Sequence, residues 1–177
     1  MNFRLLERAQ KFTGRAFSVE QVRMATPDGR ERTYDLVQHA DSISVVPVDG
    51  EGRVLFVRQY RLGAQKPLLE LPAGVMEAGE TPLECAAREI REETGRAARE
   101  LTPLGSYYLA PGYCTELMYT FLATGLVDDP LEADADEFLE VVALPVAEVY
   151  AMIRRGEMND GKSLAALLLA QQYLLMG

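Results

Sequence analysis

The stretch GVMEAGETPLECAAREIREETG, residues 74–95, is the most informative part of this chain. Its second part, TPLECAAREIREETG, changes to the apolar period of a helix. Thr81 suits the N-cap, Pro82 suits the first helical position, and Gly95 suits the stop. The sequence therefore predicts one helix between Thr81 and Gly95.

Three glutamates gather on one face of this helix. Each residue advances by about 100°, so Glu93 lies about 40° from Glu89, and Glu92 about 60° to its other side. Like charges at this spacing repel each other, and Mg²⁺ relieves the repulsion because it binds carboxylate oxygens. The alternative is a solvated helix face, on which Arg88 pairs with Glu92 and Arg91 lies near Glu92 and Glu93. In both interpretations we expect the cluster to be exposed.

The whole stretch resembles the Nudix box. That pattern is a glycine, five residues, a glutamate, seven residues and then Arg-Glu-aliphatic-any-Glu-Glu-any-Gly. The matching positions are Gly74, Glu80, Arg88, Glu89, Ile90, Glu92, Glu93 and Gly95. The box usually ends in an aliphatic residue, where this chain has Arg96, a cation that is acceptable just past a helix end. Because eight defined positions agree, the resemblance outweighs the solvated face.

The resemblance implies a magnesium-dependent hydrolase of diphosphate bonds, with Mn²⁺ as a substitute metal. The implied metal ligands are Glu89, Glu92, Glu93 and the carbonyl of Ala73. Glu92 is implied either as a direct metal ligand or as a partner that contacts the metal through water, and it is also implied in catalysis. Arg88 and Glu80 are implied to hold the shape of the loop and helix. Bound cations neutralise the diphosphate and orient water for in-line attack.

Upstream of the box stands VRQYRLGAQKPLLELPAG, residues 57–74, which is similar to bacterial ADP-ribose pyrophosphatases. The similarity implies substrate contacts from Arg61 and Arg58. For Arg58, a surface arginine at a strand end is an equal alternative. Glu70 precedes the LPAG loop, where it either binds metal or stabilises the loop.

Downstream stands SYYLAPGYCTELMYTFLA, residues 106–123. Pro111 lies 15 residues past Arg96, where a proline marks the ADP-ribose group of the family, and Pro111-Gly112 also forms a turn. Glu116 matches a family glutamate near the bound sugar or a second metal. The tyrosines either stack on adenine or belong to the core: Tyr107, Tyr108 and Tyr113.

A general base is expected in the acidic stretch LVDDPLEADADE, residues 126–137. The resemblance favours Glu137, with Asp136 and Glu140 as alternatives. The interpretation without catalysis is a solvated acidic loop. His39, the single histidine, is expected to be a hydrogen-bonded structural residue.

The composition excludes several function classes. A formal net charge of −9 disfavours a nucleic-acid partner, and one histidine excludes a zinc site of several histidines. Cys85 and Cys114, far apart, indicate free thiols in a cytoplasmic protein. No apolar run approaches the roughly 20 residues of a membrane helix, and charges interrupt the N-terminal MNFRLLERAQKF, so we expect neither a membrane partner nor a signal peptide.

Strand patterns precede the predicted helix, and strands and helices follow it, an order that predicts an α+β or α/β sandwich. The resemblance implies an α+β fold, the Nudix α/β/α sandwich with a mixed sheet, and we expect an extra N-terminal antiparallel strand region. Two hairpins are expected, 17–25 with 31–39 and 42–48 with 53–60. Further expected strands are 68–71, 99–109, 117–123 and 138–144, with a loop at 126–137 and helices at 146–155 and 162–175.

We expect an N-terminal strand region, residues 1–40, and a Nudix domain, residues 41–177. The resemblance implies a homodimer that pairs through the N-terminal strands, where Phe17, Val19 and Val22 need cover. The implied reaction is hydrolysis of ADP-ribose to AMP and ribose 5-phosphate. Three alternatives stay open: another nucleoside diphosphate sugar such as GDP-mannose, a dinucleoside polyphosphate, or a ligand sensor without turnover.

Overall fold

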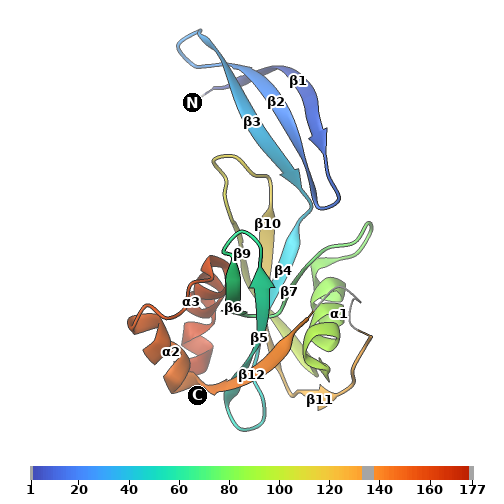
Figure 1. Cartoon of the computed structure of the whole chain (residues 1–177), viewed down its shortest axis with the longest axis vertical. Helices are drawn as coiled ribbons and strands as arrows, with labels where there is room; N and C mark the ends of the chain where they lie inside the picture. Colours follow the sequence, from blue (N-terminus) through green and yellow to red (C-terminus); the bar gives the residue numbers. More distant parts are fainter. Residues whose placement is uncertain (1, 133–137, 176–177) are drawn as a thin grey trace. The chain divides into compact units, whose positions relative to one another are not determined.

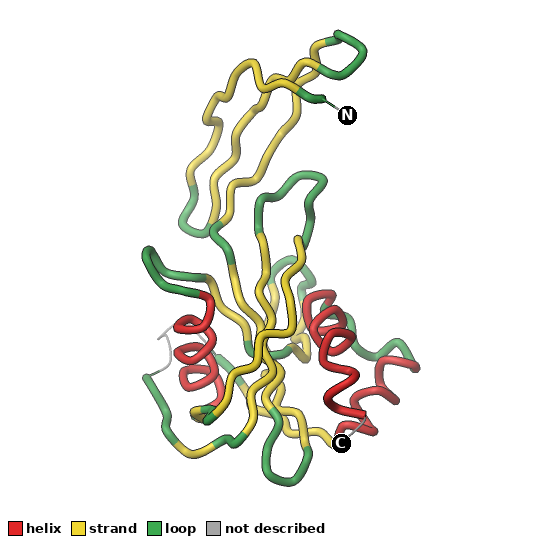
Figure 2. The backbone as a smooth tube through the Cα atoms, turned by 180° about the vertical axis from the view of Figure 1, so that it is seen from behind, coloured by secondary structure: helices red, strands yellow, loops and turns green. Residues whose placement is uncertain are grey.

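The computed structural model describes residues 2–132 and 138–175 (Figures 1 and 2). The chain divides into two compact units. The first unit comprises the chain up to Asp41 together with Tyr108–Leu117, and the second comprises Ser42–Tyr107 and the chain from Met118 onwards. Within the described ranges, no helix is both long and apolar enough to cross a membrane.

The first unit contains a three-stranded antiparallel sheet, drawn in blue in Figure 1. Its strands are β1 (Arg4–Thr13), β2 (Phe17–Ala25) and β3 (Glu31–His39). The predicted hairpin of 17–25 and 31–39 is confirmed, because β2 pairs with β3 from Phe17 opposite His39 to Ala25 opposite Glu31. The sequence analysis did not define β1, whose charged, mostly exposed residues are typical of an edge strand.

The second unit contains two main sheets and a short strand pair. The first sheet has the order β7-β4-β10-β9, and the second has the order β12-β5-β6. Their bounds are β4 (Ser42–Pro47), β5 (Arg53–Arg61), β6 (Lys66–Glu70), β7 (Ala73–Val75), β9 (Glu100–Tyr108), β10 (Leu117–Thr124) and β12 (Glu140–Pro145). The short pair joins β8 (Arg96–Ala97) to β11 (Val127–Asp128). Since β4 runs parallel to β10 and antiparallel to β7, the predicted mixed sheet is confirmed.

Helices cover both sides of these strands. On one side lies α1 (Pro82–Thr94), and on the other lie α2 (Val146–Arg154) and α3 (Gly161–Leu175) (Figures 1 and 2). The predicted helices and strands of this half are confirmed to within a few residues. The predicted loop at 126–137 contains the two residues of β11, and its part at 133–137 lies outside the described residues.

The predicted hairpin of 42–48 with 53–60 is wrong. The two strands belong to different sheets and share a single bridge, between Val48 and Val54. Every residue of β4 is buried, and its two edges already pair with β10 and β7. The chain does turn at Asp49, whose carboxylate accepts bonds from the backbone N–H groups of Glu51 and Arg53 at 2.9 Å. A tight turn between two apolar strands therefore did not imply pairing.

The core consists of two apolar clusters, one beneath each helical layer. The cluster beside α2 and α3 includes Val46, Phe56, Leu71 and Leu167. The cluster beneath α1 includes Ile43, Val45, Cys85, Ala86, Ile90 and Phe121. Because β4 contributes to both clusters, it is buried on both faces, and its two serines, Ser42 and Ser44, are buried with the apolar residues. The expected free thiols are confirmed at Cys85 and Cys114.

Candidate metal and diphosphate site

Both ends of α1 are fixed by local bonds. Thr81 Oγ1 accepts a hydrogen bond from the Glu84 N–H, and the Glu84 carboxylate accepts one from the Thr81 N–H at 2.8 Å, which forms a capping box. Gly95 ends the helix in the left-handed region at φ 70°, and its N–H bonds the Arg91 carbonyl. The predicted helix and its boundaries are therefore confirmed.

Two of the box carboxylates lie against β7 rather than in solvent. Glu93 Oε2 accepts a hydrogen bond from the Ala73 N–H at 3.0 Å. A Cβ at Gly74 would lie 1.8 Å from Glu89 Oε1, so only glycine leaves room for this carboxylate. Glu89 is 9% exposed and Glu93 is 5% exposed. The expectation of an exposed cluster is wrong, because this arc of the helix faces the backbone of β7.

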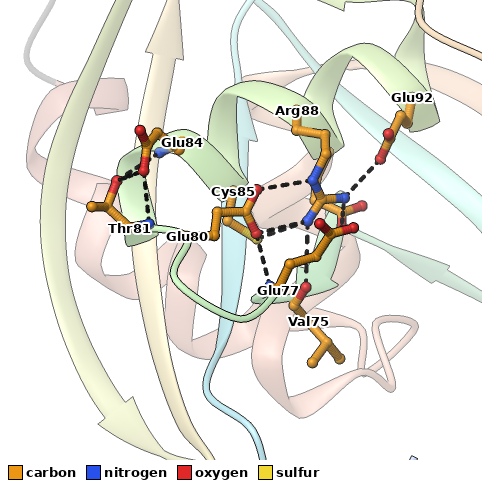
Figure 3. A network of polar contacts seen from close by, with 9 residues as sticks. Val75, Glu77, Glu80, Thr81, Glu84, Cys85, Arg88 and Glu92 are labelled. Atoms are coloured by element: carbon orange, nitrogen blue, oxygen red, sulfur yellow. Dashed lines mark hydrogen bonds and ion pairs between the residues drawn. The ribbon is translucent and has the colours of Figure 1, made fainter.

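Arg88 forms the centre of a local ion-pair network (Figure 3). Its Nε and Nη2 donate to the two oxygens of Glu80 at 2.9 and 3.0 Å. Its Nη1 donates to Glu89 at 2.7 Å and to Glu92 at 2.8 Å. The hydrogen bonds from Arg88 lower the pKa of Glu80 from 4.5 to about 2. The expected pairing of Arg88 with Glu92 is confirmed, and Arg88 joins the loop before α1 to the helix.

Arg91 does not take part in this network. The sequence analysis placed it near Glu92 and Glu93, but Arg91 pairs with Asp129 at 3.1 Å. Its Nε also donates to the Asp129 carbonyl. Helical spacing places Arg91 beside Glu92 and Glu93, but its ion-pair partner, Asp129, comes from the segment after β11. This expectation is therefore corrected.

The donor set around α1 has the chemistry of a hard-cation site. It consists of the carboxylates of Glu89, Glu92 and Glu93, with the carbonyl of Ala73 on the adjacent strand. Mg²⁺ prefers such oxygen donors. Within the described residues, no three acidic, cysteine or histidine side chains are already gathered for a metal ion. The guanidinium of Arg88 lies between Glu89 and Glu92 instead, so the residue types fit the ion while their present arrangement is held by Arg88.

A second network lies where β5 and β6 meet the start of α3. Arg61 Nε and Nη2 donate to the two oxygens of Glu70 at 2.9 and 2.8 Å. The Glu70 side chain is only 1% exposed, and Lys162 Nζ also contacts it. Burial raises the pKa of Glu70, but the hydrogen bonds from Arg61 and the charge of Lys162 outweigh burial and lower it overall. Both Glu70 oxygens are thus engaged by cationic side chains.

Arg58 and the predicted bases have a different setting. Because side chains alternate along a strand, Arg58 lies on the opposite face of β5 from Arg61. It donates to Glu140 on β12 at 2.7 Å, and both side chains are exposed. Glu137 and Asp136, two of the three candidate bases, lie outside the described residues. The roles of Arg58 and of these acidic residues remain predictions.

Pro111 and Glu116 belong to the first unit. The turn at Pro111-Gly112 is closed by the N–H groups of Tyr113 and Cys114, which bond the Ala110 carbonyl. Glu116 lies 3.8 Å from His39 Nδ1. His39 is the hydrogen-bonded residue that we expected, since its ring bonds the Ala40 carbonyl.

The three tyrosines separate into two classes. Tyr107 is half-buried and its hydroxyl donates to the Lys162 carbonyl at 2.8 Å, so it belongs to the interior of the second unit. Tyr108 and Tyr113, in the first unit, are 57% and 59% exposed. Stacking on adenine therefore remains a prediction for these two.

Sequence reasoning missed several residues that hold the second network. Asp160 directly precedes α3 and accepts bonds from the Ser163 N–H and from Lys162. An aspartate three residues before a serine was a readable cap signal, but the contact of Lys162 with Glu70 spans 92 positions and leaves no local pattern. Gln59, on the same face of β5 as Arg61, has a buried Oε1 with no hydrogen-bond partner in the described part of the chain.

Comparison with known proteins identifies the family. A model of the NUDIX domain matches residues 38–167. The chain is 32% identical over 171 residues to an ADP-ribose pyrophosphatase of Bacillus subtilis, covering 96% of this chain and 90% of that one. It is 33% identical over 168 residues to a GDP-mannose pyrophosphatase of Yersinia enterocolitica, covering 90% and 82%. The crystal structure of an ADP compounds hydrolase superposes with a TM-score of 0.89 at 27% identity, covering 98% and 95%. This chain therefore belongs to the NUDIX domain family.

Proposed function

We propose that this chain is a Mg²⁺-dependent hydrolase that cleaves the diphosphate bond of ADP-ribose to AMP and ribose 5-phosphate. The observation that carries this proposal is the pair of buried carboxylates, Glu89 and Glu93, held against the backbone of Ala73 and Gly74. The relative from Bacillus subtilis, which aligns with 96% of the chain, is named for the same substrate.

The residues that would hold the metal are Glu89, Glu92, Glu93 and the carbonyl of Ala73. When bound, Mg²⁺ neutralises diphosphate charge and lowers the pKa of water. Glu93 is oriented by the Ala73 N–H, and Glu89 by its close approach to Gly74. Arg88 Nη1 contacts Glu89 and Glu92, so a metal ion at these oxygens competes with a guanidinium that Glu80 also holds.

Substrate binding is assigned first to Arg61. A guanidinium suits bidentate contact with a phosphate, and Glu70 fixes its orientation through two bonds. The Arg61 side chain is 42% exposed, so its guanidinium is both oriented by Glu70 and accessible to a ligand. We retain Arg58, Pro111 and Glu116 as further proposed substrate contacts, and Glu137 as the proposed base.

The N-terminal strands, residues 1–40, are proposed to pair two copies of the chain, with the hydrolase domain at 41–177. The sheet of β1, β2 and β3 has one buried side chain in its described residues, Val22. Its large exposed apolar side chains are Leu5, Phe12, Phe17 and Tyr34. Such a surface favours an isologous partner. Light scattering at micromolar concentration should give a dimer, and a monomer would refute the pairing.

A second candidate substrate is GDP-mannose, because a relative named for that activity is 33% identical over 168 residues. The test is kcat/KM for ADP-ribose, GDP-mannose, NADH and a dinucleoside polyphosphate at one Mg²⁺ concentration, with identification of the products. We expect ADP-ribose to lead by about tenfold, which corresponds to about 1.4 kcal/mol of transition-state preference. If another compound leads, the named substrate is wrong. If none of the four is cleaved, the result supports the alternative of a ligand sensor without turnover.

A further inference from the structure

Lys162 stands at the start of α3 and reaches a carboxylate 92 positions earlier in the chain. Its side chain is 12% exposed, and Nζ contacts Glu70 and, at 2.8 Å, Asp160. Arg61 makes two hydrogen bonds to the same carboxylate, one of them to Oε2, the oxygen that Lys162 also contacts. One buried carboxylate is therefore shared by two cations that come from different elements.

The sharing decides how much charge Arg61 keeps for a ligand. A lone Arg61–Glu70 pair would be neutral, whereas Lys162 supplies a second positive charge to the same carboxylate. Asp160 carries one negative charge that balances Lys162, and it is bonded to Lys162, to the Ser163 N–H and to the Ser163 hydroxyl. The charge of Glu93 also acts on Arg61. Arg61 uses only Nε and Nη2 for Glu70, and in the described residues Nη1 has no hydrogen-bond partner.

The start of α3 also holds the backbone next to Glu70. Ser163 is fully buried, and its hydroxyl accepts a hydrogen bond from the Leu71 N–H at 2.7 Å. Two consecutive residues, Glu70 and Leu71, are thus held by α3. They directly precede Pro72 and Ala73, and Ala73 donates to Glu93.

We propose that Lys162 is a positioning residue for substrate, which acts through Glu70 to hold Arg61 with one guanidinium edge ready for a phosphate. The proposal rests on the proposed function, in which Arg61 contacts the diphosphate. Lys162 contacts the same oxygen of Glu70 as Arg61 Nη2, and it is not assigned any contact with the substrate. The role depends on the positive charge of this side chain.

A double-mutant cycle on KM for ADP-ribose tests the proposal. We expect Lys162→Met to raise KM by about tenfold while kcat stays within about twofold, because lost binding that is uniform between ground and transition states appears in KM. In an Arg61→Ala background, the same substitution should change KM by less than about twofold, since the residue through which it acts is gone. Lys162→Arg should recover most of the affinity.

The matched control is Lys66→Met. Lys66 lies opposite Arg61 in the β5–β6 register and is exposed. Its substitution therefore removes a nearby positive charge without changing a contact of Glu70. It should leave KM unchanged within about twofold, as expected for an exposed charge. If Lys162→Met does not fold, Lys162→Gln takes its place in the same cycle.

Three results would overturn the proposal: additive effects of Lys162→Met and Arg61→Ala on KM, an equal effect of Lys66→Met, or a loss confined to kcat. With an active wild-type enzyme, these results leave the proposed function intact. A wild-type enzyme that does not cleave ADP-ribose overturns both proposals together.

Discussion

Two charged networks in the second unit differ in how they are built. The network around Arg88 joins residues of one loop and one helix, with partners one, four and eight positions away. The network around Glu70 joins β5, β6 and α3, and its longest link spans 92 positions. The partners of Arg88 can be recognised from their spacing in the sequence, whereas the partners of Glu70 come together only when the chain folds. The comparison teaches that the residues of the proposed metal site were readable from local spacing, whereas the contacts that hold Arg61, the proposed substrate arginine, were not.

The largest effect is expected from Glu93→Gln at the proposed metal site of α1, because it should act on kcat, whereas a change in the network around Glu70 should act on KM. The amide keeps an oxygen for the Ala73 N–H but loses the charge of the proposed metal ligand. We expect kcat to fall at least about 1,000-fold, or about 4 kcal/mol, with little change in the melting temperature. Lys162→Met should instead act on KM.

The control for this substitution is Glu84→Gln. Glu84 is an exposed carboxylate of the same helix, and glutamine also serves in a capping box. It should leave kcat unchanged. If Glu93→Gln keeps near-normal kcat at saturating Mg²⁺, the carboxylates of α1 do not carry the chemistry and the comparison fails.

Arg88→Met should give the second largest effect, on stability. It removes one guanidinium from Glu80, Glu89 and Glu92, whose side chains are 13%, 11% and 23% exposed. Because these groups keep some contact with water, we expect a loss of about 2–3 kcal/mol, below that of a fully buried pair. Urea unfolding without added metal measures it, and a loss under about 0.5 kcal/mol, the level of ordinary surface changes, would show that the network contributes little.

The same network predicts a pH dependence with a defined sign. The pKa of Glu80 is lowered from 4.5 to about 2, so the folded state favours its charged form. The stabilisation is complete above pH 4.5 and is lost as the pH falls towards 2. Arg88→Met should lose less stability across this window than the wild-type protein does. Parallel stability curves for the two proteins would contradict the assignment.

A smaller effect is expected in the long-range network from Ser163→Ala. It removes the acceptor of the Leu71 N–H at a fully buried position, at an expected loss of about 1–3 kcal/mol. Ser106→Ala, at an exposed position of β9, is the control and should be neutral within about 0.5 kcal/mol. Equal melting temperatures for the two variants would show that α3 does not hold the backbone before the LPAG loop.

The sequence predicted what local rules determine. Thr81, Pro82 and Gly95 bounded the helix correctly because caps act within one turn. It did not predict that Glu89 and Glu93 are buried, because their cover is the backbone of β7, a strand of three residues. The wrong hairpin has a related cause. Apolar strands buried on both faces show that they need neighbours, but not which strands these are.

Metal binding tests most directly whether Glu89 and Glu93 form a divalent-metal site. The electron paramagnetic resonance signal of free Mn²⁺ is measured during titration into wild-type protein, Glu93→Gln and Glu84→Gln. We predict that wild type and Glu84→Gln bind the ion equally, and that Glu93→Gln binds it at least about tenfold more weakly, a difference of about 1.4 kcal/mol. Equal affinity in all three proteins would contradict the claim.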